Sequence, residues 1–165
     1  MTVRLRPARP EDVETIAELR AVVLRADLER LGRYDPAGVR RRLRDGFVAE
    51  HTWVILAADA FEGCDGEADA FAGCDGEADA FAGCVALRPA ADGHWLEHFY
   101  LAPERQGRGL GGAVLTELLA RADRSGRTVR LNVLQGSPAR RLYERFGFTV
   151  ERADAVDVWM VRQPG

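Results

Sequence analysis

Residues 104–112 form a glycine-rich segment that constrains this chain more than any other part of its sequence. The segment reads ERQGRGLGG and lies between an apolar, strand-like run and an apolar-periodic, helix-like run. Glycine permits a tight turn and leaves successive backbone N–H groups without a side chain in front of them. At the amino end of a helix, these donors and the helix dipole favour negative charge. The segment therefore predicts a phosphate-binding loop.

The composition of the chain narrows the classes of protein to which it can belong. A length of 165 residues favours one domain over residues 1–165, and 47% apolar residues suffice for a buried core. All 23 basic residues are arginine, which excludes a Walker-type phosphate loop and a lysine Schiff base. Met1–Arg6 lacks an apolar signal segment, and no apolar run is long enough to span a bilayer. We therefore expect a cytoplasmic protein that contacts neither membrane nor nucleic acid.

A ten-residue unit is repeated in tandem over residues 58–84. The copies read ADAFEGCDGE, ADAFAGCDGE and, incompletely, ADAFAGC, so Cys64, Cys74 and Cys84 are one cysteine copied. No histidine at ligand spacing accompanies them, and we predict neither a metal site nor a redox pair. The segment has eight acids and no base, and its spacing fits no calcium-binding loop. We interpret it as a solvated insertion in a hairpin connection, with at least one copy outside the main sheet.

Apolar periodicity, capping residues and turn glycines predict the element order β-α-α-β-β-β-α-β-α-β-β. The expected helices are Pro10–Leu31, Asp35–Gly46, Gly109–Gly126 and Ser137–Gly147. The expected strands are Val3–Arg6, Trp53–Ala57, Phe81–Leu87, Trp95–Leu101, Thr128–Leu134, Phe148–Glu151 and Val156–Val161. The predicted fold class is α/β (α+β): a mixed, mostly antiparallel central sheet of six or seven strands, with four helices on its faces.

The second expected helix carries a run of arginines. We interpret this run as a solvated helix face, and a wall that attracts an anionic substrate is the alternative. The arginines concerned are Arg40, Arg41, Arg42 and Arg44.

The glycines also match the dinucleotide-binding pattern Gly107-x-Gly109-x-x-Gly112. In that pattern the first glycine follows its strand directly, whereas residues 102–106 intervene here. The acid expected near the end of the next strand is missing from Arg130–Val133. A nicotinamide-binding domain therefore stays an alternative with less support.

A second pattern, Gln106-x-x-Gly109-x-Gly111, fits better. The segment LEHFYLAPERQGRGLGGAVL resembles the acetyl-coenzyme A motif of the GCN5-related N-acetyltransferases (GNAT family), and SPARRLYERFGF resembles the second signature of that family. The resemblance implies a sheet with a splayed strand pair, acetyl-coenzyme A as cofactor, and acetyl transfer to a primary amine of a small molecule or peptide. Ser137 stands where many relatives carry asparagine, and it retains the ability to cap the helix.

The resemblance also assigns residues to the cofactor. The N–H groups of residues 106–111 would hold the pyrophosphate, with added charge from Arg105 and Arg108. The main chain of Phe99, Tyr100 and Leu101 would pair with the pantetheine arm. The full set of expected cofactor contacts is completed by Gln106, Gly107, Gly109, Leu110, Gly111, Gly112, Asn132, Ser137 and Arg140.

Two residues are candidates for catalysis by direct attack in a ternary complex. We expect Glu97 to accept the proton of the amine, because strand alternation groups it with Trp95, Phe99 and Leu101 in an apolar setting. An ion pair with an arginine is the alternative. Tyr143 matches the tyrosine that, in relatives, protonates the leaving thiolate, and a core tyrosine is the alternative. Alternation places the neighbouring His98 on the opposite face, where a structural role is expected unless a bulge re-aims it.

Other functions and the identity of the acceptor stay open. A non-catalytic acyl-coenzyme A sensor or partner-binding module, with the acidic repeat as its contact arm, is the second hypothesis. A homodimer is also open. Five aromatic residues are candidates for the walls of the acceptor pocket, and each could equally be a core residue. They are Tyr34, Phe47, Trp53, Trp95 and Trp159.

Overall fold

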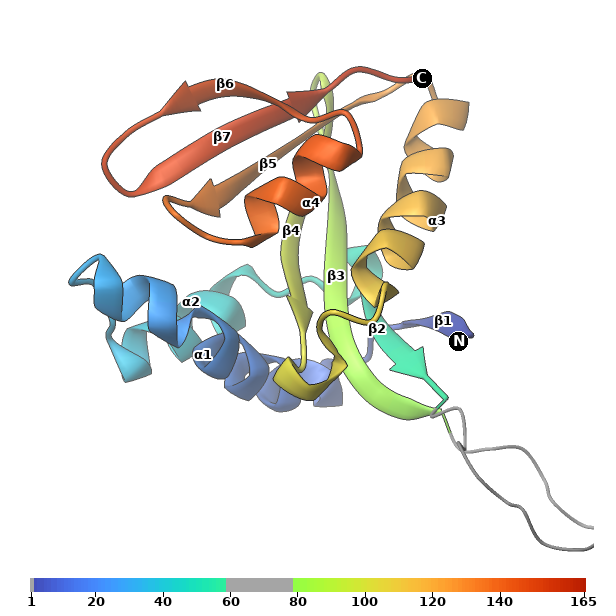
Figure 1. Cartoon of the computed structure of the whole chain (residues 1–165). Helices are drawn as coiled ribbons and strands as arrows, with labels where there is room; N and C mark the ends of the chain where they lie inside the picture. The colour runs from blue at the N-terminus through green and yellow to red at the C-terminus, as the bar shows by residue number, and fades with distance from the viewer. Residues whose placement is uncertain (1, 59–78) are drawn as a thin grey trace, which may run out of the picture.

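The computed structural model describes residues 2–58 and 79–165 (Figure 1). The strands are β1 Val3–Pro7, β2 Thr52–Ala57, β3 Ala80–Ala90, β4 Gly93–Leu101, β5 Thr128–Leu134, β6 Thr149–Ala153 and β7 Asp157–Arg162. The helices are α1 Val13–Arg30, α2 Pro36–Gly46, α3 Leu110–Arg124 and α4 Ala139–Arg145. This order confirms the one predicted from the sequence.

The strands of the described residues join one seven-stranded sheet in the order β1-β2-β3-β4-β5-β7-β6. Neighbouring strands are antiparallel except for β4 and β5, which are parallel. The mixed, mostly antiparallel sheet with four helices is therefore confirmed. The parallel pair lies in the middle of the sheet, where the two halves of the chain meet.

The strands β4 and β5 separate soon after they begin. They pair only from Gly93 to Trp95 on β4 and from Thr128 to Arg130 on β5. Beyond these residues β4 continues to Leu101 and β5 to Leu134, and no pairing between the two is found among the described residues. The splayed strand pair is thus present, and it leaves one backbone edge of β4 open.

Two apolar cores lie on opposite faces of the sheet. Side chains from α3 and Tyr143 of α4 pack with the sheet in the larger core, which includes Val85 of β3. The α1 residues Ile16, Ala17 and Leu19 pack with Cys84 of β3 and Tyr100 of β4 in the other. Because Cys84 and Val85 are adjacent in one strand, the two cores must lie on different faces. Helices α3 and α4 therefore cover one face and α1 the other (Figure 1).

Glycines and prolines end and start the helices where the sequence predicts. Gly147 has φ +85°, and the Phe148 N–H donates to the Tyr143 carbonyl at 3.2 Å, which closes α4 with a left-handed cap. Gly126, with φ +62°, follows α3 in the same conformation. The sequence predicts Ser137 as the first cap of α4, but Pro138 occupies that position, and α4 begins at Ala139. The Ser137 hydroxyl still accepts the Ala139 N–H, at 3.4 Å.

The incomplete last copy of the repeat forms the beginning of β3, where Ala80–Cys84 pairs with β2 and β4. Apart from Ala58, the two full copies lie outside the described residues, and their cysteines Cys64 and Cys74 do so as well. The prediction that at least one copy lies outside the main sheet also concerns these residues. Cys84 is fully buried, and burial raises the pKa of its thiol to about 12. A reactive thiolate at this position is therefore disfavoured.

Two arginines of α2, Arg40 and Arg44, contact α1. Arg40 donates to Glu18 at 2.6 and 2.9 Å, and Arg44 donates to Glu14 at 2.8 and 2.9 Å. These are solvated ion pairs between two helices, in agreement with the solvated-face interpretation. No helix in residues 2–58 or 79–165 is long and apolar enough to cross a membrane.

Candidate active site

The glycine-rich loop joins the end of β4 to the start of α3. A short 3-10 helix, Pro103–Arg105, follows β4, and α3 begins at Leu110. Gly107 has φ +73° and Gly109 has φ +82°, the left-handed conformation that side chains rarely adopt. A Cβ added to either glycine would meet no atom within 4 Å. Glycine is therefore required here by the backbone conformation, and the space above the loop is open.

The open N–H groups of the loop begin one residue later than expected. The Gln106 N–H donates to the Pro103 carbonyl at 3.2 Å, so this N–H is unavailable to a phosphate. The Gln106 side chain donates to the Leu101 carbonyl at 3.0 Å and ties the loop to the end of β4. Within the described parts of the chain, the N–H groups of residues 107–112 have no hydrogen-bond acceptor, and Ala113 is the first to bond in helical fashion, to Gly109. The run of open N–H groups is thus 107–112, whereas the sequence predicts 106–111 for a phosphate.

Gly111 serves a different purpose from the loop glycines. A Cβ added to it would lie 3.0 Å from Leu142 and 3.6 Å from Leu101. The absence of a side chain lets the first turn of α3 pack directly against α4 and the end of β4. This close packing places the open N–H groups beside the open edge of β4.

The main chain of Tyr100 faces β3 and not the open edge. A Cβ added to Gly83 would collide with the Tyr100 carbonyl oxygen, and Tyr100 pairs with Cys84 in the sheet. Because alternate residues of a strand direct their backbone groups to opposite neighbours, Phe99 and Leu101 face the gap toward β5. The expectation that the main chain of Tyr100 pairs with pantetheine is therefore wrong, because this main chain already pairs with β3. The expectation stays a prediction for Phe99 and Leu101.

A β-bulge in β4 changes the side-chain pattern that the sequence predicts. Glu97 lies opposite Ala86 and Tyr100 opposite Cys84, so His98 and Phe99 together oppose a single residue of β3. His98 has φ +50° and is the only residue other than glycine with positive φ in the described chain. The extra residue reverses the alternation beyond it.

The predicted grouping of Glu97 with Phe99 and Leu101 is consequently wrong. Phe99 and Leu101 pack in the same core as Leu96, on the α3 side of the sheet. Glu97 follows Leu96 directly, so its side chain points to the other face. The bulge therefore sends the carboxylate of Glu97 to the face that carries α1.

Glu97 holds the ion pair that the sequence left open as an alternative. Arg88 Nε donates to Glu97 Oε1 at 2.9 Å, and the Glu97 side chain is 29% exposed. The carboxylate is thus ordered at the surface of the sheet, at the point where β4 bulges. Its role as a base stays a prediction.

His98 joins a hydrogen-bonded chain that sequence reasoning missed. Arg20 Nε donates to the Tyr100 hydroxyl at 3.1 Å, and Arg20 Nη1 donates to the Val39 carbonyl at 2.6 Å. The Tyr100 hydroxyl lies 3.4 Å from His98 Nδ1. The Tyr100 hydroxyl thus accepts from Arg20, and the direction of its contact with His98 depends on which ring nitrogen of the histidine carries the proton.

Burial shifts the pKa of both His98 and Tyr100. It lowers the pKa of His98 and raises the pKa of Tyr100 to about 12. Both groups are therefore neutral near pH 7, consistent with the structural role expected for His98. Arg20 gave no signal in the sequence beyond its place on an amphipathic helix.

Tyr143 lies in the larger core beside the open edge of β4. Its side chain is 7% exposed, and its ring packs against Phe99 and Phe148 with centroids 6.5 and 5.8 Å away. No described residue accepts or donates a hydrogen bond at its hydroxyl, and burial raises its pKa above the ordinary value. The hydroxyl is therefore a protonated donor without a partner in the described chain.

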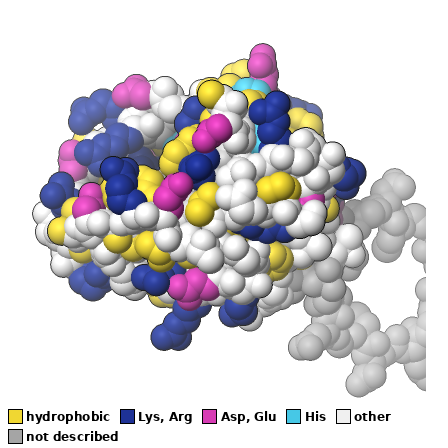
Figure 2. All heavy atoms as spheres, turned by 90° about the horizontal axis from the view of Figure 1, so that it is seen from above, with side chains coloured by type: hydrophobic (Ala, Val, Ile, Leu, Met, Phe, Trp, Pro, Cys, Tyr) yellow, Lys and Arg dark blue, Asp and Glu magenta, His cyan; other side chains and the backbone are white. Residues whose placement is uncertain are grey.

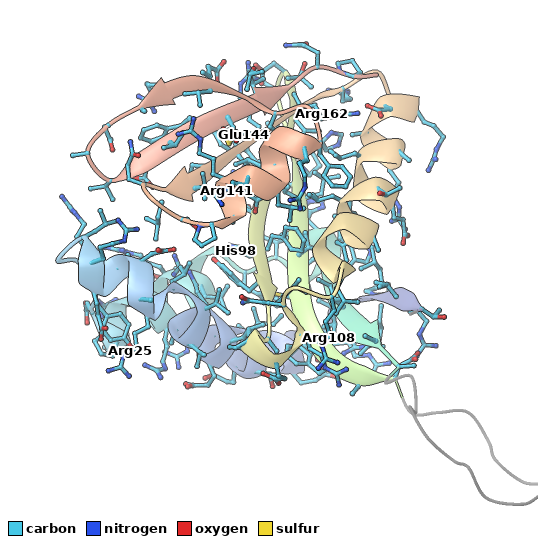
Figure 3. The ribbon with its side chains drawn as sticks, in the orientation of Figure 1. Arg25, His98, Arg108, Arg141, Glu144 and Arg162 are labelled. Carbon is cyan, nitrogen blue, oxygen red and sulfur yellow. The ribbon has the colours of Figure 1, made fainter. Side chains whose placement is uncertain are left out.

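The remaining predicted cofactor residues differ in their availability. Asn132 donates to Asp157 at 3.0 Å, and Arg140 donates to Glu144 at 2.8 Å. Each of these side chains therefore already has a hydrogen-bond partner within the protein. Arg108 extends from the loop at the lower end of α3, whereas His98 lies on β4 beneath α4 (Figure 3). Arg105 closes the 3-10 helix before the loop.

Three of the candidate acceptor-wall residues pack against apolar clusters, and Tyr34 does so in a third cluster, with Ala21, Leu28 and Val39. Phe47 packs in the α1 core, and Trp53 packs in the α3 core. The guanidinium of Arg152 stacks on the Trp159 ring, with its Cζ 3.9 Å from the ring centroid. The guanidinium of Arg25 stacks on the Tyr34 ring in the same way, at 5.5 Å. Trp95 pairs with Arg130 where β4 and β5 part. Of these aromatic side chains, Trp95 is the one nearest in sequence to Glu97.

Comparison with known proteins agrees with the fold and the motifs. The profile of the acetyltransferase (GNAT) domain matches residues 49–150. A search of curated proteins finds no match.

Solved structures of acetyltransferases share this fold. The PaiA N-acetyltransferase of Thermoplasma acidophilum, solved with coenzyme A, is 22% identical with a TM-score of 0.68, over 99% of each chain. An acetyltransferase of Thermus thermophilus is 19% identical with a TM-score of 0.67, over 99% of this chain and 97% of that one. The ribosomal-protein-S18-alanine N-acetyltransferase of Escherichia coli is 14% identical with a TM-score of 0.65, over 99% and 95%.

The family profile covers more than half of the chain, including the glycine-rich loop, the splayed strands and Tyr143. GNAT domains bind acetyl-coenzyme A, which agrees with the cofactor predicted from the sequence. The nicotinamide alternative finds no support in these comparisons. The chain belongs to the GNAT family of acetyltransferases.

Proposed function

We propose that the protein transfers the acetyl group of acetyl-coenzyme A to a primary amine of a small molecule or peptide. The observation that carries this proposal is the run of open N–H groups over residues 107–112, placed beside the open edge of β4. Such a run at a helix start suits a pyrophosphate. An unpaired strand edge suits the amides of a pantetheine arm.

In this proposal each part of the site binds one part of the cofactor. The N–H groups of residues 107–112 bind the pyrophosphate, and Arg108 adds positive charge above the loop. The backbone of Phe99 and Leu101 bonds to the pantetheine amides. The thioester then lies near the bulge at His98, where β4 and β5 have separated.

The chemical step needs a base and an acid on either side of the thioester. The amine nitrogen forms a bond to the thioester carbonyl carbon, and the carbon–sulfur bond breaks. Glu97 accepts the proton lost by the amine, directly or through water. Tyr143 donates its phenolic proton to the departing sulfur, which is consistent with a hydroxyl that is protonated and has no partner in the described chain.

Calorimetry and a thiol assay test the proposal together. We expect saturable binding of acetyl-coenzyme A, and release of free thiol in proportion to acetylated amine when a panel of primary amines is added. Mass spectrometry of the acceptor shows whether the mass of one acetyl group has been gained. Binding without thiol release from any amine would favour the non-catalytic sensor, and absence of binding by folded protein would overturn the cofactor assignment.

A further inference from the structure

Helix α1 contacts both strands of the splayed pair near their carboxyl ends. Arg20 of this helix donates to the hydroxyl of Tyr100 near the end of β4, at 3.1 Å. Arg30 donates to the carbonyl of Gln135, which follows the last residue of β5, at 2.5 Å. Figure 1 shows α1 running from the lower end of β4 toward the side on which β5 ends. One helix therefore connects the two strands beyond the point where their pairing stops.

Apolar packing follows the same course along α1. In its first half, Ile16 belongs to the buried cluster that contains Tyr100 of β4. In its second half, Leu28 belongs to another cluster, and Leu134, the last residue of β5, packs against that cluster. The first half of the helix is thus attached to β4 and the second half to the end of β5.

The contact of Arg30 is built around a glycine and a fixed carbonyl. Gly136 has φ +74°, and a Cβ added to it would lie 2.9–3.0 Å from atoms of the Arg30 guanidinium. The backbone N–H of Gln135 donates to the Val156 carbonyl, and its side chain donates to the Asp154 carbonyl, both at 2.8 Å. The carbonyl that accepts from Arg30 therefore belongs to a segment that is bonded to the β6–β7 turn.

These contacts, and not surface exposure, distinguish Arg20 and Arg30 from the other arginines. Figure 2 shows arginine side chains over much of the face that it presents, so an exposed arginine is common on this molecule. Arg25, also on α1, bonds to Glu29 of the same helix, and Arg44 joins α1 only to α2. Arg20 and Arg30 instead join α1 to β4 and to the loop that follows β5.

The length of α1 between these two contacts is sufficient to cross a gap that holds one extended chain. Arg30 follows Arg20 by ten residues, which corresponds to roughly 15 Å along the helix axis. Neighbouring strands lie about 4.8 Å apart, so an extended arm between β4 and β5 requires about 10 Å between the two strands.

We infer that α1 fixes the separation of β4 and β5, and that Arg20 and Arg30 are positioning residues for the pantetheine arm of the cofactor. The inference rests on the proposed binding of this arm at the open edge of β4. With the separation fixed in the free protein, binding of the arm does not include the free-energy cost of ordering the two strands. The pyrophosphate, which in the proposed function lies at residues 107–112, does not depend on this separation.

Calorimetry with coenzyme A and with ADP tests the inference on the full-length protein. ADP carries a pyrophosphate and lacks the pantetheine arm. Arg30→Met removes the donor to Gln135 and should raise the Kd for coenzyme A by about tenfold. The Kd for ADP should change less than about twofold, because its contacts are made at the loop before α3.

Arg44→Met is the matched control for Arg30→Met. The two arginine side chains are 44% and 46% exposed, and each holds α1 to another part of the chain. The contact of Arg44 with Glu14 involves neither of the splayed strands. Arg44→Met should therefore change the Kd for coenzyme A less than about twofold. Circular dichroism shows whether each variant is folded.

Gly136→Ala and Gly126→Ala form a second pair, in which no charge is removed. Both glycines have positive φ, so the backbone strain of the two variants is similar. Only Gly136→Ala displaces the Arg30 guanidinium, since a Cβ at position 126 meets no atom within 4 Å. Gly136→Ala should therefore raise the Kd for coenzyme A more than about threefold, and Gly126→Ala should leave it nearly unchanged.

Three results would overturn the inference: equal Kd values for coenzyme A in both arginine variants, equal values in both glycine variants, or an equal loss of affinity for ADP and coenzyme A in Arg30→Met. Failure of the wild-type protein to bind coenzyme A would instead contradict the proposed function. The two failures are therefore distinguishable.

Discussion

Phe99 on β4 and Tyr143 on α4 pack together, with ring centroids 6.5 Å apart and planes inclined by 51°. The contact joins the strand that precedes the glycine-rich loop to the helix that follows β5. It holds the Tyr143 ring beside the open edge of β4, where a thioester would lie under the proposed function.

Replacing Tyr143 with phenylalanine should separate chemistry from folding. The hydroxyl has no hydrogen-bond partner in the described chain, so its loss should change the free energy of unfolding by less than about 0.5 kcal/mol. Loss of the acid should lower kcat on the order of 10²-fold, with little change in the KM for acetyl-coenzyme A. Steady-state kinetics and urea unfolding measure the two effects.

Tyr100→Phe is the control for that variant. Its hydroxyl accepts the bond from Arg20, and its removal should destabilise the fold by about 1–2 kcal/mol. If Tyr143→Phe retains full kcat, the role of this tyrosine as an acid is refuted.

Glu97→Gln and Arg88→Gln together distinguish a base from a structural ion pair. Each removes one partner of the same contact, so a purely structural pair predicts equal, small effects on stability and activity. If Glu97 accepts the amine proton, Glu97→Gln should lower kcat on the order of 10²-fold. Arg88→Gln should then retain most of the activity. Equal kcat values for the two variants would argue against Glu97 as the base.

Gly109→Ala tests the cofactor loop, and Gly126→Ala is its control. Both glycines have positive φ, and an added Cβ meets no atom within 4 Å at either one. Each alanine should therefore cost about 1–2 kcal/mol of stability through backbone strain. Only Gly109→Ala lies among the open N–H groups, and it should raise the Kd for acetyl-coenzyme A by about tenfold in calorimetry. Equal Kd values would show that the loop does not bind the cofactor.

The contact between Asp123 and Arg162 should make stability depend on pH in acid. Arg162 donates to both carboxylate oxygens, at 2.6 and 2.9 Å, and the Gly165 N–H donates at 3.0 Å. These bonds, led by the one from Arg162, lower the pKa of Asp123 from 3.8 to about 2. Because the folded state favours the ionised form, this stabilisation is complete above pH 3.8 and is lost as the pH falls toward 2.

Asp123→Asn is the corresponding variant. At neutral pH it should reduce the free energy of unfolding by about 1–2 kcal/mol. The difference from the wild type should shrink as the pH is lowered through the same range, in urea titrations at a series of pH values. A difference that stays constant with pH would contradict the assignment.

Local signals explain why most elements were predictable. The strand Thr128–Leu134 has the predicted bounds because a glycine ends the helix before it and an apolar alternation fills it. Gly147 adopts the predicted left-handed conformation because the Schellman cap depends on one residue. In both cases the determinant lies within a few residues of the feature it determines.

The bulge at His98 was not predictable in the same way. No residue type marks the insertion of an extra residue in β4, and its effect depends on the pairing with β3. The same holds for the contact of Arg88 with Glu97, which requires the register of two strands. The chain from Arg20 through Tyr100 to His98 joins residues about 80 positions apart and requires the packing of α1 on the sheet.

The final, incomplete repeat copy supplies the first residues of β3, and Ala80 pairs with Ala57 at the end of β2. The two complete units differ only at Glu62 and Ala72, so loss or gain of one whole unit restores nearly the same sequence at both junctions. Slippage during replication of this stretch of the gene would therefore alter the length of the polypeptide and leave the amino acids of every described residue pair in the sheet unchanged.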